Sequence, residues 1–152
     1  MKIFFFMSVL FVSLSTYAQK INPQYDSVLA QKYKGDENGM KMYVLVMLKT
    51  GSNTTTDKAF IDSCFTGHMN NIGRLAKEGK LIVAGPLAKN PQTYRGIFIF
   101  DTKDIEEARI WVMTDPAVSS RLLDAELFNW YGSAALPAYI YESEKVWKQR
   151  GF

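Results

Sequence analysis

The sequence contains one cysteine, Cys64, and one histidine, His68. A single cysteine excludes a disulfide within the chain, and neither a CxxC nor an HxxxH spacing occurs, so too few metal ligands of the usual kinds are present for a zinc-type site. No glycine-rich loop of the kind that cradles phosphate groups occurs either. The sequence therefore predicts a protein that works with no metal and no cofactor.

Clusters of basic residues are also missing. The formal net charge is +3, from 18 Lys and Arg against 15 Asp and Glu, and these residues do not gather into a stripe. Nucleic-acid binding depends on such a basic surface to neutralise phosphates. We therefore expect no nucleic acid among the partners.

No apolar run near the N-terminus is long enough to cross a membrane, which takes about 20 apolar residues in a helix. Residues 3–14 form a shorter apolar segment that follows Lys2 and precedes the small-residue region 15–18. This pattern is typical of an export signal cleaved after Ala18. We expect residues 1–18 to be removed, leaving a soluble chain with no membrane segment in the periplasm or outside the cell.

The remaining sequence predicts one domain with alternating strands and helices. Strands are predicted at residues 41–49, 81–85, 94–101 and 124–131, with a helix at 58–78 and another from 105 to Asp115-Pro116, where a short second helical piece begins. This order is the βαββαβ pattern of an α+β, ferredoxin-like fold, assigned to residues 41–133. Residues 19–40 are predicted as a linker or a loosely packed arm. Residues 134–152 are a C-terminal extension without an assigned structure.

The predicted strands are apolar on both faces. In the first strand Val44 and Val46 lie on one face, and Tyr43 and Leu45 lie on the other. Two helices can cover only one face of an antiparallel sheet, so the second face needs another cover. We expect a second subunit to stack on it, which gives a homodimeric α+β barrel. The aromatic C-terminal tail folding back over the sheet is the competing cover.

His68 has both a functional and a structural interpretation. It lies on the apolar stripe of the predicted helix, with the stripe comprising Ile61, Phe65, His68, Ile72 and Leu75. Imidazole exchanges protons near neutral pH, which suits a catalytic role, but a lone histidine on an apolar face is more often structural. A nucleophilic pair of Cys64 and His68 is conceivable at a spacing of four residues, although a cysteine beside such a stripe is more commonly a small buried hydrophobe.

Asp115 has two interpretations as well. An Asp directly before a Pro is a common helix N-cap, with Pro at the first helical position, and that role alone would explain Asp115 and Pro116. The alternative is a carboxylate that accepts a hydrogen bond from a histidine ring, fixes its tautomer and leaves the other ring nitrogen as a base or an acid.

Several short motifs between Met42 and Tyr131 resemble, in their order and spacing, those of the YciI-like (YCII-related) proteins. The motifs are His68 with Leu75, Gly79 and Leu81, the strand end Gly85-Pro86-Leu87, the run Glu106-Glu107-Ala108, and Asp115-Pro116. The resemblance implies a ferredoxin-like fold, a dimeric barrel and an active site built on the helix histidine and the Asp of Asp-Pro. On this chain those residues are His68 and Asp115.

Three features depart from the family pattern. Members often carry an Arg a few residues before the histidine, where this chain has Phe65-Thr66, and they are mostly cytoplasmic and lack a long C-terminal extension. The family has few assigned reactions, one of them a dehydrochlorination in aromatic degradation, so the resemblance implies a site more than a substrate.

Two functions are therefore expected as alternatives. The first is an exported small-molecule enzyme in which His68 and Asp115 transfer a proton in an elimination, an isomerisation or a hydrolysis. Gly85, Pro86 and Trp130 would help to line its substrate pocket. The second is a non-catalytic module on the same fold that binds a small molecule or a protein partner through the pocket or the aromatic tail.

Overall fold

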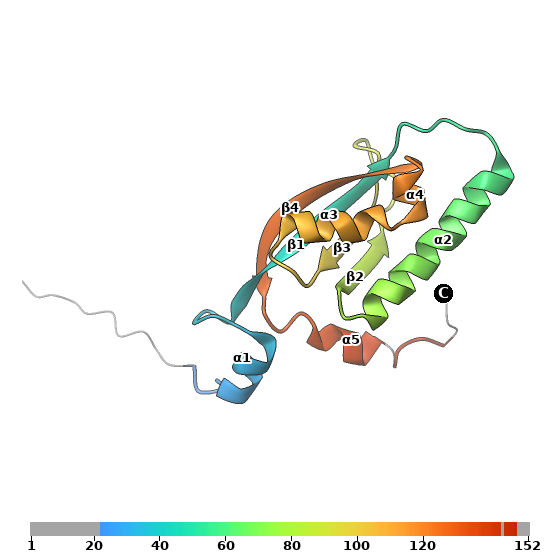
Figure 1. The fold of residues 1–152 in the computed structure, drawn as a ribbon. Coiled ribbons are helices and arrows are strands. Elements are labelled where there is room, and N and C mark those ends of the chain that lie inside the picture. Colours follow the sequence, from blue (N-terminus) through green and yellow to red (C-terminus); the bar gives the residue numbers. More distant parts are fainter. Residues whose placement is uncertain (1–21, 144, 149–152) are drawn as a thin grey trace, which may run out of the picture.

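The computed structural model describes residues 22–143 and 145–148, so the predicted export signal lies outside the described residues. Its centre is a four-stranded antiparallel sheet in the order β2-β3-β1-β4 (Figure 1). The strands are β1 (Met40–Thr50), β2 (Leu81–Pro86), β3 (Tyr94–Phe100) and β4 (Leu123–Ser133). Strand β3 separates β1 from β2, and β1 separates β3 from β4, which is the split β-α-β arrangement of a ferredoxin-like fold. The predicted α+β fold class is confirmed.

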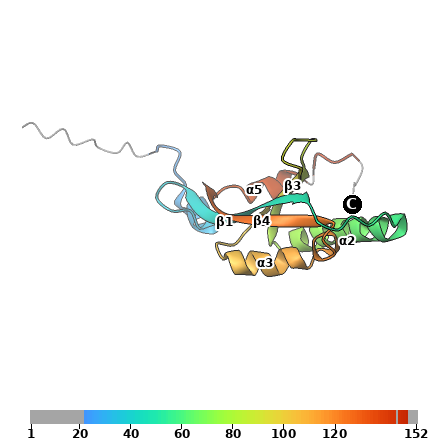
Figure 2. The same ribbon diagram turned by 90° about the horizontal axis from the view of Figure 1, so that it is seen from above.

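Three helices lie on one face of this sheet, namely α2 (Lys58–Lys77), α3 (Ile105–Met113) and the short α4 (Pro116–Ser119). Figure 2 shows α2 and α3 on the same side of the strands. The predicted strands and helices of this unit are all found, with ends that differ by one or two residues. Such agreement is expected for long segments with a regular apolar period.

Local sequence signals set the ends of the helices. The carboxylates of Asp57 and Asp104 accept hydrogen bonds from backbone amides in the first turns of α2 and α3. After α2, Gly79 adopts a φ of 69°, and the amide of Lys80 donates to the carbonyl of Leu75 at 3.0 Å. Glycine takes this left-handed conformation without the cost that a side chain imposes. The chain can therefore turn directly from α2 into β2.

The main core lies between these helices and the sheet. Strands β1 and β3 contribute fully or almost fully buried side chains to it, and Leu75 of α2 and Val112 of α3 pack against them. The strand residues are Val44, Val46, Leu48, Phe98 and Phe100. They alternate along each strand, so they all point to the helical side. The neighbouring residues along the strands point to the other face.

The other face of the sheet carries a second apolar cluster of Tyr43, Ile82 and Ile99. Leu136 and Ile140, from the C-terminal tail and its helix α5 (Ala138–Ser143), pack against this cluster. Figure 2 shows α5 on the side of the sheet opposite α2 and α3. The tail therefore covers part of the second face, as the competing interpretation expected.

The rest of the second face has no such cover among the described residues. Leu45 and Met47 of β1 are half-buried, and Phe128, the β4 partner of Leu45, is 48% exposed. We call the surface of these three residues the open patch. A second subunit on the open patch stays a prediction.

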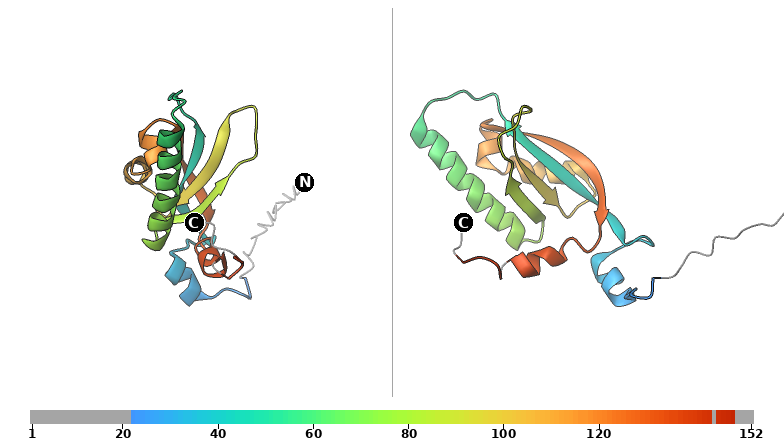
Figure 3. Two further views of the ribbon diagram at one scale, coloured as in Figure 1. Left: turned by 90° about the vertical axis from the view of Figure 1, so that its right-hand side faces the viewer. Right: turned by 180° about the vertical axis from the view of Figure 1, so that it is seen from behind.

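The segment before β1 contains a helix that the sequence did not predict, α1 (Ser27–Tyr33). None of its residues is buried, and the Asp26 carboxylate caps its first turn. Asp36, in the turn that follows, accepts hydrogen bonds from the backbone amide of Met40 and from the hydroxyl of Tyr131 on β4. Figure 3 shows α1 and α5 at the same end of the sheet. Within the described ranges, no helix has the length and hydropathy that crossing a membrane requires.

Candidate functional site

The structure brings His68 and Asp115 into direct contact across 47 residues of sequence. His68 lies in the middle of α2, Asp115 lies directly before α4, and the imidazole Nδ1 is 2.6 Å from the carboxylate Oδ2. The Asp115 side chain is fully buried, and the His68 side chain is 13% exposed. A buried carboxylate is stable only when its oxygens find donors, which fits an Nδ1–H that donates to Oδ2.

Asp115 makes both of the contacts that the sequence offered as alternatives, the helix cap and the contact with a histidine ring. While Oδ2 accepts from His68, Oδ1 accepts a hydrogen bond from the backbone amide of Ala117 at 2.9 Å and so caps α4. Each carboxylate oxygen thus accepts a different hydrogen bond, and the cap fixes the direction in which Oδ2 points. The helix cap and the contact with the histidine are therefore one structural unit.

Aromatic rings surround the imidazole. Phe98 of β3 stacks on it with ring centroids 5.9 Å apart, and Phe65 of α2 meets it edge to face at 6.0 Å. Among the described residues, Nε2 of His68 makes no hydrogen bond, whereas Nδ1 has Asp115. With its proton on Nδ1, the neutral ring therefore carries a lone pair on Nε2 within a largely apolar environment.

Gly67 allows the two helices to approach this closely. A Cβ at Gly67 would lie 2.7 Å from Cγ of Pro116, which is closer than a side chain tolerates. The structure identifies the group that approaches Gly67 as the proline ring of α4.

Cys64 does not take part in the His68–Asp115 pair. It is 8% exposed, and no hydrogen bond joins it to His68 within the described part of the chain. This placement agrees with the interpretation of Cys64 as a small buried hydrophobe.

The structure does not bring Trp130 to His68. Trp130 pairs with Tyr43 across β1 and β4, and its ring lies 5.6 Å from the Tyr43 ring on the second face of the sheet. His68 packs on Phe98 at the helical face, so the sheet separates Trp130 from the imidazole. The expectation that Trp130 lines the same pocket as His68 is corrected. Side chains of β4 alternate between the two faces of the sheet, and Trp130 lies on the face opposite His68.

Gly85 and Pro86 end strand β2. They follow Ala84, whose β3 partner is Phe98, the ring that stacks on His68. The end of β2 is therefore beside the aromatic wall of the site. A direct contact of Gly85 or Pro86 with a substrate stays a prediction.

Sequence reasoning missed a polar network next to the site. Arg74 of α2 donates hydrogen bonds to Asn71 Oδ1 at 2.7 Å and to Thr114 Oγ1 at 2.9 Å, and it pairs with Glu78 at 2.8 Å. Thr114 directly precedes Asp115, so this network ties α2 to the chain segment that holds the carboxylate. The i, i+3 spacing of His68, Asn71 and Arg74 was the available signal. Arg74 is therefore occupied by partners within the chain.

No group of three or more His, Cys, Asp or Glu side chains within residues 22–143 and 145–148 is arranged to hold a metal ion. No protein-family model matches the chain, and no curated protein matches it. The resemblance to the YciI-like proteins therefore stays a prediction.

Among solved structures, the chain is similar to 5-chloro-2-hydroxyhydroquinone dehydrochlorinase from Burkholderia phenoliruptrix AC1100 in complex with 2,5-dihydroxybenzoquinone. The identity is 19%, the alignment covers 58% of this chain and 92% of that chain, and the TM-score is 0.43. The ferredoxin-like assignment follows from this chain's own strand order and does not depend on that similarity.

Proposed function

We propose that this protein is an enzyme that acts on a small molecule, with His68 transferring a proton and Asp115 orienting the imidazole ring. The observation that carries the proposal is the 2.6 Å contact between His68 Nδ1 and the fully buried Asp115 carboxylate. A carboxylate that accepts from Nδ1–H fixes the tautomer and leaves Nε2 available to a reacting group.

The proposed chemistry is general acid–base catalysis. Nε2 of His68 would accept a proton from a carbon, a hydroxyl or a water at the substrate, and the imidazolium that forms would be stabilised by the Asp115 carboxylate. Return of that proton to another position completes an isomerisation, and its delivery to a leaving group completes an elimination or a hydrolysis. The rings of Phe65 and Phe98 beside His68 favour a substrate with an apolar part.

A second candidate is a non-catalytic module that binds a small molecule on the same fold. One observation favours it: a large cavity of this protein lies between α2 and the C-terminal tail, and His68 is not among its lining residues. In that case the His68–Asp115 contact would serve only to hold α2 and α4 together.

A screen of small molecules by thermal shift should first identify a ligand, since a molecule that binds the folded state raises the melting temperature. His68→Gln should then keep the fold and abolish turnover of that ligand. Asp115→Asn should keep the cap of α4, because Asn caps a helix about as well as Asp, and should lower turnover because the carboxylate charge is gone. It should also cost roughly 1–3 kcal/mol of stability, because the buried hydrogen bond with His68 is lost.

A purely structural role differs in the expected turnover of the same variants. Loss of the buried contact should cost His68→Gln roughly 1–3 kcal/mol of stability in either case, but with a purely structural histidine turnover and ligand affinity would be unchanged. Full turnover in both variants would end the proposed roles of His68 and Asp115. A ligand that the unsubstituted protein binds but does not convert would leave the binding module standing.

A further inference from the structure

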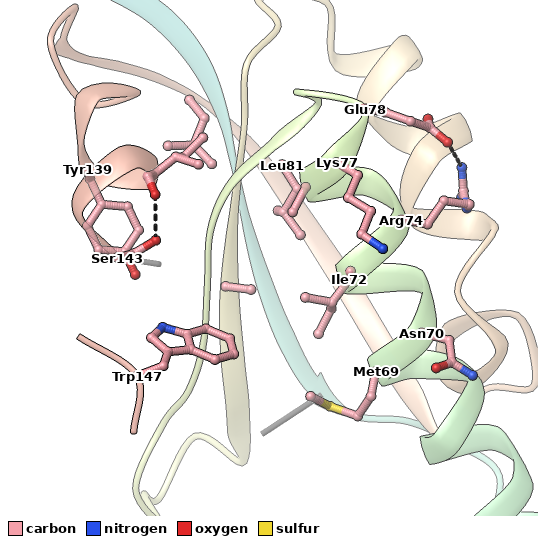
Figure 4. A pocket seen from close by; sticks show the side chains of 15 residues that line it. Met69, Asn70, Ile72, Arg74, Lys77, Glu78, Leu81, Tyr139, Ser143 and Trp147 are labelled. Carbon is pink, nitrogen blue, oxygen red and sulfur yellow. Dashed lines mark hydrogen bonds and ion pairs between the residues drawn. The ribbon is translucent and has the colours of Figure 1, made fainter. Parts of the chain in front are cut away.

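A cavity of about 650 Å³ lies between α2 and the C-terminal tail, beside the start of β2. Figure 4 shows Met69, Ile72 and Lys77 of α2 on one side of it and Tyr139 and Trp147 of the tail on the other. Strand β2 is at the edge of the sheet, so no neighbouring strand closes this side. The volume is within the range of about 300–1,000 Å³ that is usual for pockets that hold small molecules.

This cavity is separate from the His68–Asp115 site. Met69, Gly73 and Lys77 line it and are four residues apart, so they form one stripe along the flank of α2 that faces the tail. The opposite flank carries Gly67, which lies against Pro116 of α4. Arg74 lies between the two flanks, since it donates to Thr114 and also lines the cavity. Helix α2 thus has the proposed catalytic site on one flank and the cavity on the other.

The charges around the cavity leave one cation without a partner. Arg74 and Glu78 pair with each other at 2.8 Å, and Glu78 also pairs with Lys80 at 2.6 Å. Lys77 makes no ion pair or hydrogen bond among the described residues. The charged lining residues are Arg74, Lys77 and Glu78, two cations against one anion, which leaves a net charge of +1 at the cavity.

We propose that this cavity binds a small amphiphilic organic anion. Its aromatic or aliphatic body would lie between Ile72 and Trp147, and its anionic group would pair with Lys77. The apolar walls favour burial of the body, and the unpaired ammonium selects for a negative charge over a neutral head group.

A peptide that adds a strand to the sheet fits this place less well. Strand β2 has only six residues, and its pairing with β3 shifts register between Leu81 and Val83. Pro86, at its end, has no amide hydrogen to donate to an added strand. A peptide needs a regular run of free backbone groups for this mode of binding, which β2 does not provide.

The proposal can be tested with two fluorescent probes that share an aromatic body. 8-Anilinonaphthalene-1-sulfonate carries one negative charge, and N-phenyl-1-naphthylamine is the same body without the sulfonate. We expect the sulfonate probe to bind the full-length protein more tightly than the neutral one. Lys77→Gln should lower the affinity for the sulfonate probe by about fivefold, as for one partly exposed ion pair, and leave the affinity for the neutral probe unchanged.

Two further variants complete the test. Gly73→Leu should lower the affinity for both probes, because the new side chain would project into the cavity. A Cβ added at Gly73 would meet no atom within 4 Å, so the helix can accept the substitution. Lys103→Gln removes the same charge from an exposed residue outside the cavity and should change neither affinity. Equal affinities of the two probes, equal effects of the two lysine variants, or unchanged binding in Gly73→Leu would each overturn the proposal.

Discussion

The α-carbon of Gly67 lies against the ring of Pro116, and each residue is the direct chain neighbour of one member of the His68–Asp115 pair. A Cβ on Gly67 would be 2.7 Å from Cγ of Pro116. The missing side chain therefore sets how closely α2 and α4 approach, and with it the 2.6 Å separation of the imidazole and the carboxylate.

Gly67→Ala should push α2 and α4 apart and damage the site. We expect a loss of about 1–2 kcal/mol of stability from overpacking, together with reduced turnover of whichever substrate is found. The matched control is Gly73→Ala in the same helix, whose new Cβ meets no atom within 4 Å. That variant should gain about 0.5–1 kcal/mol because alanine favours the helix over glycine. Urea unfolding measures the stability of both variants, and a gain of stability in Gly67→Ala would contradict the close contact.

Ionisation of the Tyr43 hydroxyl should lower the stability of the protein at alkaline pH. The side chain is buried, and its hydroxyl donates a hydrogen bond to the carbonyl of Ser133 at 2.7 Å. Burial, and to a smaller degree the carboxylate of Asp101, raises the pKa of Tyr43 from 10.0 to about 12. Between these values the unfolded chain has released the proton while the folded chain still holds it, so the free energy of unfolding falls as pH rises. The expected loss is about 2 kcal/mol.

Tyr43→Phe supplies the comparison for this pH dependence. At neutral pH it should be about 1 kcal/mol less stable than the unsubstituted protein, because the hydrogen bond to Ser133 is lost. As the pH rises above 10.0, the deficit should close, since Phe has no proton to release. Urea unfolding at a series of pH values measures the difference, and a deficit that stays constant would show that the Tyr43 hydroxyl is not responsible.

Pairing of two subunits through the open patch should depend on Phe128. Burying apolar surface stabilises by about 25 cal/mol per Å², so covering this partly exposed patch with a second subunit is favourable. Phe128→Asp should shift a dimer towards monomer and keep the fold, because the side chain is 48% exposed in the single chain. Ile110→Asp is the control, since Ile110 is 67% exposed on α3, on the other side of the molecule. Sedimentation of the unsubstituted protein as a monomer at micromolar concentration would leave the tail as the cover of this face.

Cleavage of the export signal can be checked by measuring the intact mass of the protein. Expressed from Met1 in a Gram-negative host, the protein should be recovered from the periplasm without residues 1–18. Replacing residues Leu10 and Val12 by Glu should interrupt the apolar segment and keep the uncut chain in the cytoplasm. An intact leader on the unsubstituted protein would contradict cleavage after Ala18.

The elements of the sheet and its helical layer were predictable because their apolar residues follow a regular period. Strand β1 and helix α2 extend over 11 and 20 residues, long enough for the period to be unambiguous. Helix α1 is different: it has seven residues and buries none of them, so no apolar stripe marked it in the sequence.

The site was only partly predictable. Nothing in the local sequence joins His68 to Asp115, and only the resemblance to a family suggested the pair before the structure showed the contact. The place of Trp130 depends on the register that sets it opposite Tyr43, and periodicity alone does not reveal which face of a doubly apolar strand meets the helices. The cavity depends on Trp147 and on other tail residues that carry no repeating pattern.

Helix α5 restricts how two copies of this chain can meet. It already occupies the sheet around Tyr43, Ile82 and Ile99, so within the described part of this face the open patch of Leu45, Met47 and Phe128 is left for a partner. In a symmetric pair the same patch of both subunits meets at a two-fold axis, which would then pass beside Leu45 and Phe128. The cavity lies beside β2 at one edge of the sheet, whereas the open patch lies on β1 and β4, so pairing through the patch would leave the cavity accessible to a ligand.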